Sequence, residues 1–216
     1  RKSVVNLVEI KTIEQVEWIR QQRNRPELYK YFRQDRPITE TEQAKWWKNL
    51  DKNTVNLFIV EDEMERRVGY VGFNPLNRYA MMAEFGTFIL PEFQDKGHGK
   101  EALLQLLTMG FCEMGLRTIY SDCLEYPGED RFGYYGGIGF VANGIQSIRY
   151  KKQGVWVPST KFFMTKEMFD KKHGDRANKG KLEAWGKAAA YTRKLAQAAS
   201  KSVGLHPSQT NVNPAA

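Results

Sequence analysis

Hydrophobic and polar residues alternate with two different periods in the first part of the chain. Four short apolar runs bounded by polar turns predict β-strands. They are residues 3–10, VNLFIVED from Val55, RVGYVGFNPL from Arg67, and YAMMAEFGTFIL, which ends at Leu90. The segment TIEQVEWIRQQR has apolar residues three and four apart and predicts a helix. A second helix is predicted for ITETEQAKWWKNL, where Thr39 and Glu42 form a capping box. Between these two helices the polar segment RNRPELYKYFRQDRP is expected to be broken by its prolines.

The pattern changes after Leu90. A polar loop, PEFQDKGHGK, leads directly into the apolar helical segment EALLQLLTMGFCEMG. A strand (RTIYSDCL), a helix (EDRFGYYGGIG) and two closing strands (GFVANGIQSIRYKK and VWVPSTKFFMTKEMF) follow. This order predicts an α+β fold with a mixed, mostly antiparallel central sheet flanked by helices.

The composition changes again near residue 168. We therefore expect a folded domain over residues 1–168 and an extension over 169–216, consisting of a basic linker (KKHGDRANKG), an Ala-rich helix with one apolar stripe, and an extended tail. From Lys166 onward there are ten Lys and Arg residues against four Asp and Glu residues. Residues 180–216 are the predicted contact for a protein partner or for another copy of the chain.

Composition excludes several classes of protein. The 216 residues are 41% hydrophobic, which suffices for one full core, but no apolar run approaches the ~20 residues of a membrane span. We expect a cytoplasmic protein with no membrane partner. Much of the net charge of +8 lies in the extension, which has few base-stacking aromatic residues and so argues against a nucleic-acid partner. Neither cysteine belongs to a metal-binding pattern, so we expect free thiols and no metal.

The loop from Gln94 to Gly99 is the main candidate for chemistry. It precedes a helix, whose first N–H groups lack intrahelical acceptors and lie at the positive end of the helix dipole. Gly97 and Gly99 let the backbone approach a ligand closely, which predicts binding of a pyrophosphate. A plain surface turn would have a similar sequence and remains an alternative.

Two other phosphate-binding motifs fit less well. Residues 97–102 match GxGxxA, and Asp122 lies about where a dinucleotide fold needs its acidic residue. However, six residues including Pro91 separate the preceding strand from Gly97, whereas in a dinucleotide fold the strand runs almost straight into the first glycine. A Walker loop is excluded, because Lys100 is followed by Glu101 instead of Ser or Thr.

The segment AEFGTFILPEFQDKGHGKEAL resembles motif A of the GNAT superfamily, whose loop pattern is Q/R-x-x-G-x-G/A. The likeness extends through ITETEQAKWW and through the Y-x-x-x-G-F element at residues 135–140, and it is closest to spermidine, ribosomal-protein N-terminal and amino-sugar acetyltransferases. The resemblance implies a GNAT fold and an N-acetyltransferase. Such an enzyme would transfer an acetyl group from acetyl-CoA to a primary amine, either a small molecule such as an amino-sugar or a protein N-terminus.

The resemblance also assigns the coenzyme site. The loop amides would hold the diphosphate of coenzyme A, and the backbone of the preceding strand would pair with pantetheine like an added strand and supply an N–H to the oxyanion. These cofactor-binding positions are Phe88, Ile89, Leu90, Gln94, Asp95, Lys96, Gly97, His98, Gly99 and Lys100.

Two catalytic residues are implied by the same resemblance. Tyr135 matches the tyrosine that protonates the departing thiolate, whereas Tyr134 is expected in the core. Glu84, a charged residue in an otherwise apolar strand, is the candidate base that takes the proton of the amine. An ion pair with a nearby Arg or Lys is the alternative role for Glu84. The sequence departs from some relatives at Cys123, where they have a base glutamate, and at Gly128, where they have an asparagine.

The acceptor site is expected between the first two helices. This stretch is basic and aromatic, which favours an anionic acceptor such as a nucleotide amino-sugar, although a solvated surface loop would have the same composition. The residues concerned are Arg23, Arg25, Tyr29, Lys30, Tyr31, Phe32, Arg33 and Arg36. A different function remains open: a GNAT fold could serve as a structural or binding component of a larger assembly, such as a virion, and dock through its C-terminal extension.

Overall fold

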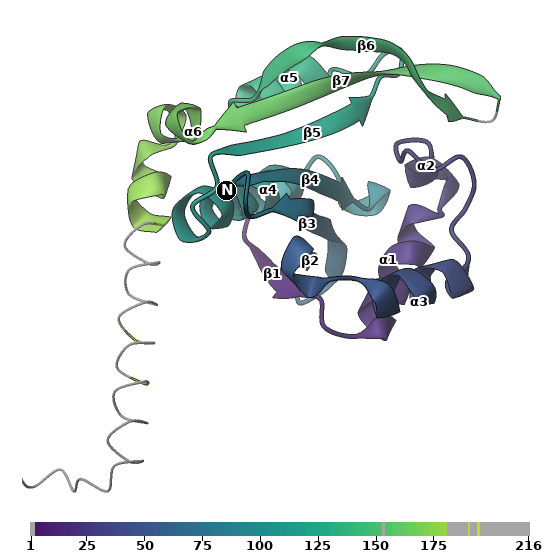
Figure 1. Ribbon diagram of the computed structural model, residues 1–216, viewed down its shortest axis with the longest axis horizontal. Helices are drawn as coiled ribbons and strands as arrows, with labels where there is room; N and C mark the ends of the chain where they lie inside the picture. Colours follow the sequence, from purple (N-terminus) through teal and green to yellow (C-terminus); the bar gives the residue numbers. More distant parts are fainter. Residues whose placement is uncertain (1–2, 153, 181–189, 191–193, 195–216) are drawn as a thin grey trace, which may run out of the picture.

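The computed structural model describes residues 3–152 and 154–180, together with Ala190 and Lys194 (Figure 1). The strands are β1 (Val5–Glu9), β2 (Asn56–Asp62), β3 (Arg67–Asn77), β4 (Met82–Ile89), β5 (Thr118–Leu124), β6 (Val141–Lys152) and β7 (Val155–Thr165). The α-helices are α1 (Ile13–Arg23), α2 (Pro26–Tyr29), α3 (Glu40–Asn49), α4 (His98–Thr108), α5 (Arg131–Ile138) and α6 (Lys166–Lys172).

All seven strands form one sheet in the order β1-β2-β3-β4-β5-β7-β6. Only β4 and β5 are parallel, so the predicted mixed, mostly antiparallel sheet is confirmed. The β4–β5 pairing covers three residue pairs and ends at Glu84 opposite Tyr120. Beyond this point the two strands separate, and Figure 1 shows β5, β6 and β7 diverging from β4. The sheet is therefore split on one side of Glu84.

Local sequence signals explain the helix ends. Thr12 and Thr39 cap α1 and α3, each through a complete capping box. The segment after α1, expected to be broken by its prolines, also contains the short helix α2, because Pro26 occupies its first position, where its missing N–H costs nothing. The last predicted strand is too long: β7 ends at Thr165, whose side chain accepts the N–H of Met168 and starts α6.

The two faces of the sheet are buried by different helices. On one face α4 covers a core that includes Phe73, Phe85 and Phe162. On the other face α1 and α2 cover a smaller core that includes Ile59 and Phe88. Neighbouring residues of one strand, such as Phe58 and Ile59, belong to different cores because successive side chains point to opposite faces.

The start of the extension packs on the folded body. Residues 174–180, expected as a linker from their composition, are helical, and Ala177 is buried in the α4 core. Arg176 forms hydrogen bonds with both carboxylate oxygens of Glu101 in the first turn of α4, the shortest at 2.8 Å. The predicted domain boundary at residue 168 falls within α6. The predicted Ala-rich helix and tail lie outside the described residues, apart from Ala190 and Lys194.

No helix in the described part of the chain has the length and apolar character needed to cross a membrane.

Candidate active-site cleft

A cleft of about 990 Å³ lies where β4 and β5 separate. It is lined by β4, the loop before α4, β5, α5 and the segment between α1 and α3. Most of the predicted site residues are brought together here: Glu84, Phe88, Ile89, Gln94, Asp95, Gly97, His98, Gly99, Lys100 and Tyr135.

Two predicted cofactor residues, Leu90 and Lys96, do not line this cleft. Leu90 is buried in the smaller core, and its N–H donates to the carbonyl of Val68 at 2.9 Å. The Lys96 ammonium group folds back and donates to the carbonyl of Glu92 at 3.1 Å. Any role of Lys96 in this cleft would therefore fall to its backbone.

The loop before α4 presents free N–H groups. Glu101 is the first residue of α4 whose N–H has a backbone acceptor, the Gly97 carbonyl at 3.1 Å. Among the described residues, the N–H groups of residues 95–100 have no acceptor. Asp95 and Gly97 both have left-handed backbone conformations, with φ of 60° and 84°. Such alternation turns successive N–H groups toward one side of a loop and creates an anion site.

The two glycines of this loop are required for different structural reasons. Gly97 is the N-cap of α4 and needs its positive φ. Gly99 has ordinary φ, but a Cβ there would lie 3.2 Å from Ile89 Cγ1 and 3.3 Å from the Tyr134 hydroxyl, two residues that line the cleft. A side chain at Gly99 would therefore reach into the space in front of the free amides. His98, which lies between the two glycines in sequence, contacts the Ser3 hydroxyl through Nδ1 at 2.6 Å.

The edge of β4 that faces the split is not paired with β5 beyond Glu84. In an antiparallel pair, consecutive residues direct their backbone groups to opposite sides. Because the Leu90 N–H bonds toward β3, the backbone of Ile89 points into the split, where the Gln94 side-chain amide donates to its carbonyl at 2.8 Å. Of the three residues expected to pair with pantetheine, this alternation favours Ile89.

Glu84 lies at the apex of the split. Its side chain is 10% exposed, and its carboxylate forms an ion pair with Arg33 from the segment between α1 and α3. The Arg33 side chain is 43% exposed. Glu84 thus has the cationic partner that a buried carboxylate requires, and that partner is free to move toward solvent.

Of the two consecutive tyrosines, Tyr135 is buried and Tyr134 is exposed. Tyr135 is 5% exposed and packs on Phe162 with a ring-centroid distance of 4.8 Å, whereas Tyr134 is 43% exposed, so its expected core position is wrong. The helix that carries them starts at Asp130, whose side chain accepts the Gly133 N–H at 2.7 Å, and this start sets which tyrosine faces the sheet. Both tyrosines line the cleft.

Burial controls the proton chemistry around Tyr135. It raises the pKa of Tyr135 well above the ordinary value, so the phenol stays protonated at neutral pH. Burial also raises the pKa of Cys123, whose thiol interacts with the Tyr135 hydroxyl. A buried thiol with a raised pKa is a poor nucleophile, which agrees with the prediction of a free, structural cysteine.

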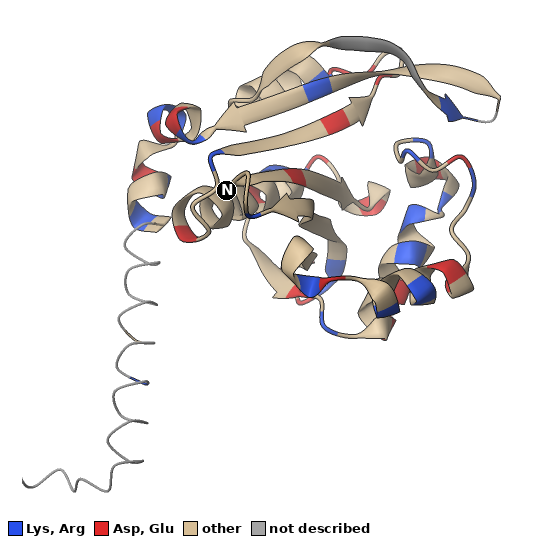
Figure 2. Ribbon diagram, viewed as in Figure 1, with Lys and Arg blue, Asp and Glu red and all other residues tan. Residues whose placement is uncertain are grey.

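The basic segment between α1 and α3 is largely neutralised by acids. Figure 2 shows Lys and Arg side by side with Asp and Glu along this part of the chain. Ion pairs join Arg25 to Glu92 and Glu27, Lys30 to Glu129, Arg33 to Glu84 and Arg36 to Glu42.

One residue missed by the sequence analysis holds this segment in place. Lys152, at the end of β6, is 7% exposed and donates to the carbonyls of Tyr29 at 3.4 Å, Phe32 at 2.9 Å and Gln34. The contact spans more than a hundred residues of sequence, so no local pattern could reveal it.

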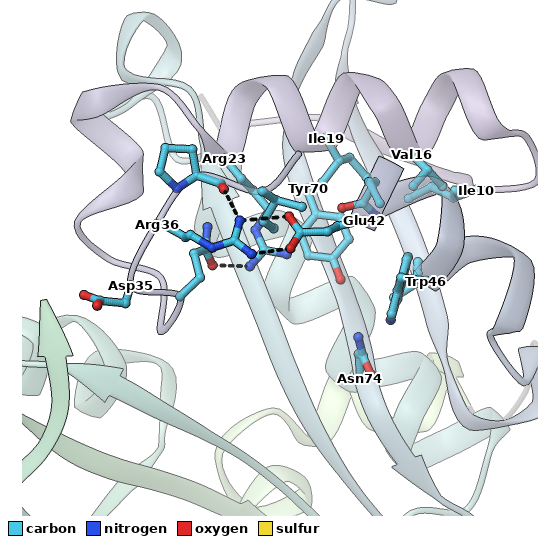
Figure 3. Close-up of a pocket in the computed structure, with 15 residues that line it drawn as sticks. Ile10, Val16, Ile19, Arg23, Asp35, Arg36, Glu42, Trp46, Tyr70 and Asn74 are labelled. Atoms are coloured by element: carbon cyan, nitrogen blue, oxygen red, sulfur yellow. Dashed lines mark hydrogen bonds and ion pairs between the residues drawn. The ribbon is translucent and has the colours of Figure 1, made fainter. Parts of the chain in front are cut away.

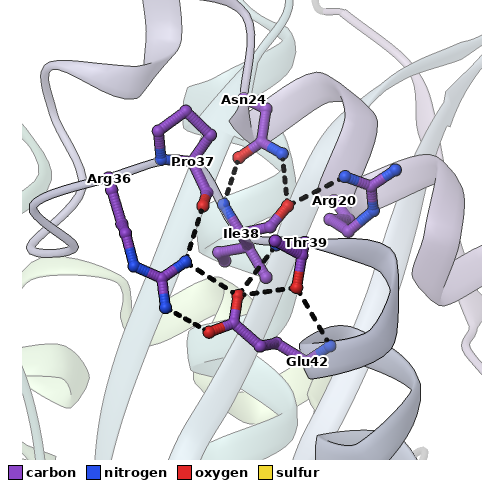
Figure 4. A network of polar contacts seen from close by, with 7 residues as sticks. All are labelled: Arg20, Asn24, Arg36, Pro37, Ile38, Thr39 and Glu42. Carbon is purple, nitrogen blue, oxygen red and sulfur yellow. Dashed lines mark hydrogen bonds and ion pairs between the residues drawn. The ribbon is translucent and has the colours of Figure 1, made fainter.

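The end of the segment is fixed by a polar network (Figure 4). Asn24 exchanges two hydrogen bonds with the backbone of Ile38, of 2.7 and 2.9 Å, and the Arg20 guanidinium donates to the same carbonyl at 2.8 Å. Glu42 accepts from Arg36 and closes the capping box of α3. The entry to α3 is thereby tied to the C-terminal end of α1.

A second cavity of about 630 Å³ adjoins the cleft (Figure 3). It lies between α1, α3 and β3, and Figure 3 shows apolar side chains, including Ile19 and Trp46, on one side of it and Arg36 and Asp35 on the other. The two cavities share five lining residues: Arg23, Gln34, Ile38, Tyr70 and Asn74.

The fold and the cleft define a class of protein. A split between two parallel strands, followed by a loop with free amides at a helix N-terminus, fits the pantetheine and diphosphate of a coenzyme A thioester, and so defines an acyltransferase fold. A family model described as acetyltransferase (GNAT) domain matches residues 6–125. The chain therefore belongs to the GNAT acetyltransferase family, as the sequence resemblance implied.

Known relatives agree with this assignment. The spermidine N(1)-acetyltransferase of Vibrio cholerae serotype O1 is 31% identical over 98 residues, which is 45% of this chain and 56% of that protein. The match thus spans only a little over half the length of this curated relative.

Solved structures share the fold at lower identity. A spermidine N-acetyltransferase from Vibrio cholerae, crystallised with CoA and spermine, has a TM-score of 0.69 at 22% identity and covers 76% of this chain and 97% of that one. A dodecameric structure of spermidine N-acetyltransferase from the same organism has a TM-score of 0.67 at 20% identity and covers 78% and 98%.

Proposed function

We propose that this chain transfers an acetyl group from acetyl-CoA to a primary amine bound in the cleft. The observation that carries the proposal is the set of free N–H groups at residues 95–100, which faces the same cleft as Glu84 and Tyr135. An anion site, a buried carboxylate and a protonated phenol are the groups that such a transfer needs. Family membership supports the proposal, as does the relative crystallised with CoA and spermine.

Coenzyme binding would rest on the backbone. The amides of residues 95–100 would bind the diphosphate, and the open edge of β4 at Ile89 would pair with pantetheine. This places the thioester near the apex of the split, between Glu84 and Tyr135. An N–H on the same edge would stabilise the oxyanion of the tetrahedral intermediate.

Glu84 would prepare the amine. An alkylammonium group has a pKa near ~10 and must lose a proton before its nitrogen attacks the thioester. The incoming ammonium would take the place of Arg33 at the Glu84 carboxylate, which then accepts the proton directly or through water. The exposure of the Arg33 side chain makes this exchange possible without opening the core.

Tyr135 would complete the transfer. When the tetrahedral intermediate collapses, the carbon–sulfur bond breaks and the phenol donates its proton to the thiolate of CoA. Tyr134 is a matched control, because it neighbours Tyr135 in sequence and lines the same cleft. Tyr135→Phe is expected to lower kcat at least ~100-fold, the usual size of a general-acid contribution, whereas Tyr134→Phe changes it little. Equal effects of the two substitutions would remove Tyr135 from this role.

Acetyl-CoA binding, measured by calorimetry, tests the proposal before any acceptor is known. Gly99→Trp fills the space in front of the loop amides and is expected to abolish binding. Gly174→Trp is the control, because a Cβ there meets no other atom within 4 Å. If the intact chain does not bind acetyl-CoA, the enzymatic function fails and a role in an assembly takes its place. Binding that survives Gly99→Trp would put the coenzyme elsewhere.

Self-association is a further part of the proposal. The Vibrio cholerae relative forms a dodecamer, which supports an oligomer here as well. Residues 180–216 remain the proposed contact for another copy or for a protein partner. Analytical ultracentrifugation of the chain truncated after Gly180 tests this, because the truncation keeps Ala177 and the Arg176–Glu101 contact. If the truncated chain has the same oligomeric state as the intact chain, the segment is excluded as the contact.

A further inference from the structure

Arg23, at the end of α1, differs from the basic residues between α1 and α3, where the acceptor site is expected. The four basic residues there form ion pairs with a glutamate, whereas Arg23 has no carboxylate partner among the described residues. Its guanidinium group donates to the Gln34 side-chain oxygen at 2.8 Å and lies 4.5 Å from the centroid of the Phe32 ring. A cation in such surroundings is not compensated by charge.

Two hydrogen-bond donors at this position are buried and unsatisfied. They are Nε of Arg23 and Nε2 of Gln34, and neither has an acceptor in the described part of the chain. Burial lowers the pKa of Arg23, and the positive charge of Arg33 acts in the same direction. Buried donors without acceptors are costly and rare in folded proteins, so they mark a place where a ligand supplies the acceptor.

The position of Arg23 connects the cleft with the second cavity. Arg23 and Gln34 line both spaces, and the neighbouring Tyr70 ring, whose pKa burial raises to about 12, contributes no negative charge at neutral pH. In Figure 3, Arg23 lies beside Tyr70, with Ile19 and Trp46 farther along the cavity. A molecule whose amine is at Glu84 would meet these donors first and the apolar cavity next.

We propose that Arg23 and Gln34 bind an anionic group of the acceptor, which is therefore an amine that carries a carboxylate or a phosphate. The inference rests on the proposed acetyl transfer and specifies its substrate class. Anionic oxygens satisfy a guanidinium group and an amide with strong hydrogen bonds. A polyamine would instead bring a second positive charge next to Arg23 and Arg33, which is unfavourable beside a guanidinium that is largely withdrawn from solvent.

A matched series of amines tests this. The release of CoA thiol from acetyl-CoA is followed with 4-aminobutyrate, phosphoethanolamine, n-butylamine, putrescine and spermidine. The chain is expected to favour one of the two anionic amines over n-butylamine by at least ~10-fold in kcat/KM, the value of one hydrogen bond to a charged group. The preferred anionic amine then identifies carboxylate or phosphate as the bound group. Both cationic acceptors are expected to be poorer than n-butylamine.

Variants of Arg23 separate recognition from folding. Arg23→Met is expected to remove the preference, so that the ratio of kcat/KM for the anionic amine to kcat/KM for n-butylamine falls toward 1. Arg23→Lys keeps the charge and is expected to retain part of the preference. Lys45→Met, which removes an exposed cation of α3, is the control and should change nothing. A loss of equal size for all amines in Arg23→Met would contradict the inference.

Calorimetry of the amines in the presence of CoA distinguishes the two proposals. If thiol is released but putrescine or spermidine is preferred, the acetyl transfer stands and the anionic acceptor is wrong. If no amine reacts, but an anionic amine binds in a manner that depends on Arg23, the binding site stands and the transfer fails. If the anionic amines neither react nor bind, both fail.

Discussion

Replacing Lys152 by methionine tests how the acceptor side of the cleft is held. The ammonium group donates to three backbone carbonyls of residues 29–34, and methionine keeps most of the length of the side chain but none of these bonds. Hydrogen bonds to charged groups contribute ~1.5–3 kcal/mol each. Burial lowers the pKa of Lys152, so part of this gain is offset by the loss of hydration of the ammonium.

The net loss in Lys152→Met is therefore taken as that of one strong bond, ~2–3 kcal/mol. For a chain of this size it corresponds to a fall of ~4–12 °C in the thermal midpoint. Because Lys152 fixes the segment that carries Arg33 and Gln34, KM for the acceptor should rise while the Kd for acetyl-CoA is unchanged. Lys151→Met, at the exposed neighbouring position, is the control.

Thermal unfolding by circular dichroism and calorimetry with acetyl-CoA supply the two readouts. A thermal midpoint of Lys152→Met equal to that of Lys151→Met would refute the assignment. So would a parallel loss of acetyl-CoA affinity, because the hydrogen bonds of Lys152 in the described part of the chain go to residues 29–34 and not to the loop of residues 95–100.

Three further substitutions probe other parts of the structure. Hydrogen bonds from Arg36 and from the capping box lower the pKa of Glu42 from 4.5 to about 2, so the stability they add is present above pH 4.5 and is lost as the pH falls toward 2. The thermal midpoints of the unmodified chain and Glu42→Gln should thus converge over this range, and a constant gap would contradict the shift. Arg176→Met removes the cation that pairs with the Glu101 carboxylate in the first turn of α4. The unpaired negative charge should weaken acetyl-CoA binding, measured by calorimetry, because it lies near the proposed anion site. An unchanged Kd would show that Glu101 does not act on that site. Phe162→Ala removes a ring that is 1% exposed, at a cost of ~3–5 kcal/mol, and a thermal midpoint lowered by less than ~6 °C would contradict its place in the core.

Most of the fold could be predicted because its signals are local. The capping boxes at Thr12 and Thr39 mark the starts of α1 and α3 within four residues of sequence, and strand periodicity gave the rest of the order. The errors also have local causes. Pro26 was interpreted only as a break although it also starts α2, and Met168 and Phe169, interpreted as part of the last strand, hid the cap that starts α6.

The site could be predicted only in part, because its contacts join distant segments. The loop of residues 94–100 is continuous, so its motif was visible in the sequence. The pairing of Glu84 with Arg33 and the bonds from Lys152 depend on tertiary packing. Gln34 carries no charge or motif, and its importance follows only from its contact with Arg23.

Amide hydrogen exchange in the presence and absence of acetyl-CoA tests the central claim most directly. The N–H groups of residues 95–100 have no acceptor in the described part of the chain, so they should exchange rapidly without ligand. Binding of the coenzyme diphosphate to these groups predicts strong protection of this loop and of the β4 edge at Ile89. Exchange in the loop that stays rapid at saturating acetyl-CoA would contradict the account.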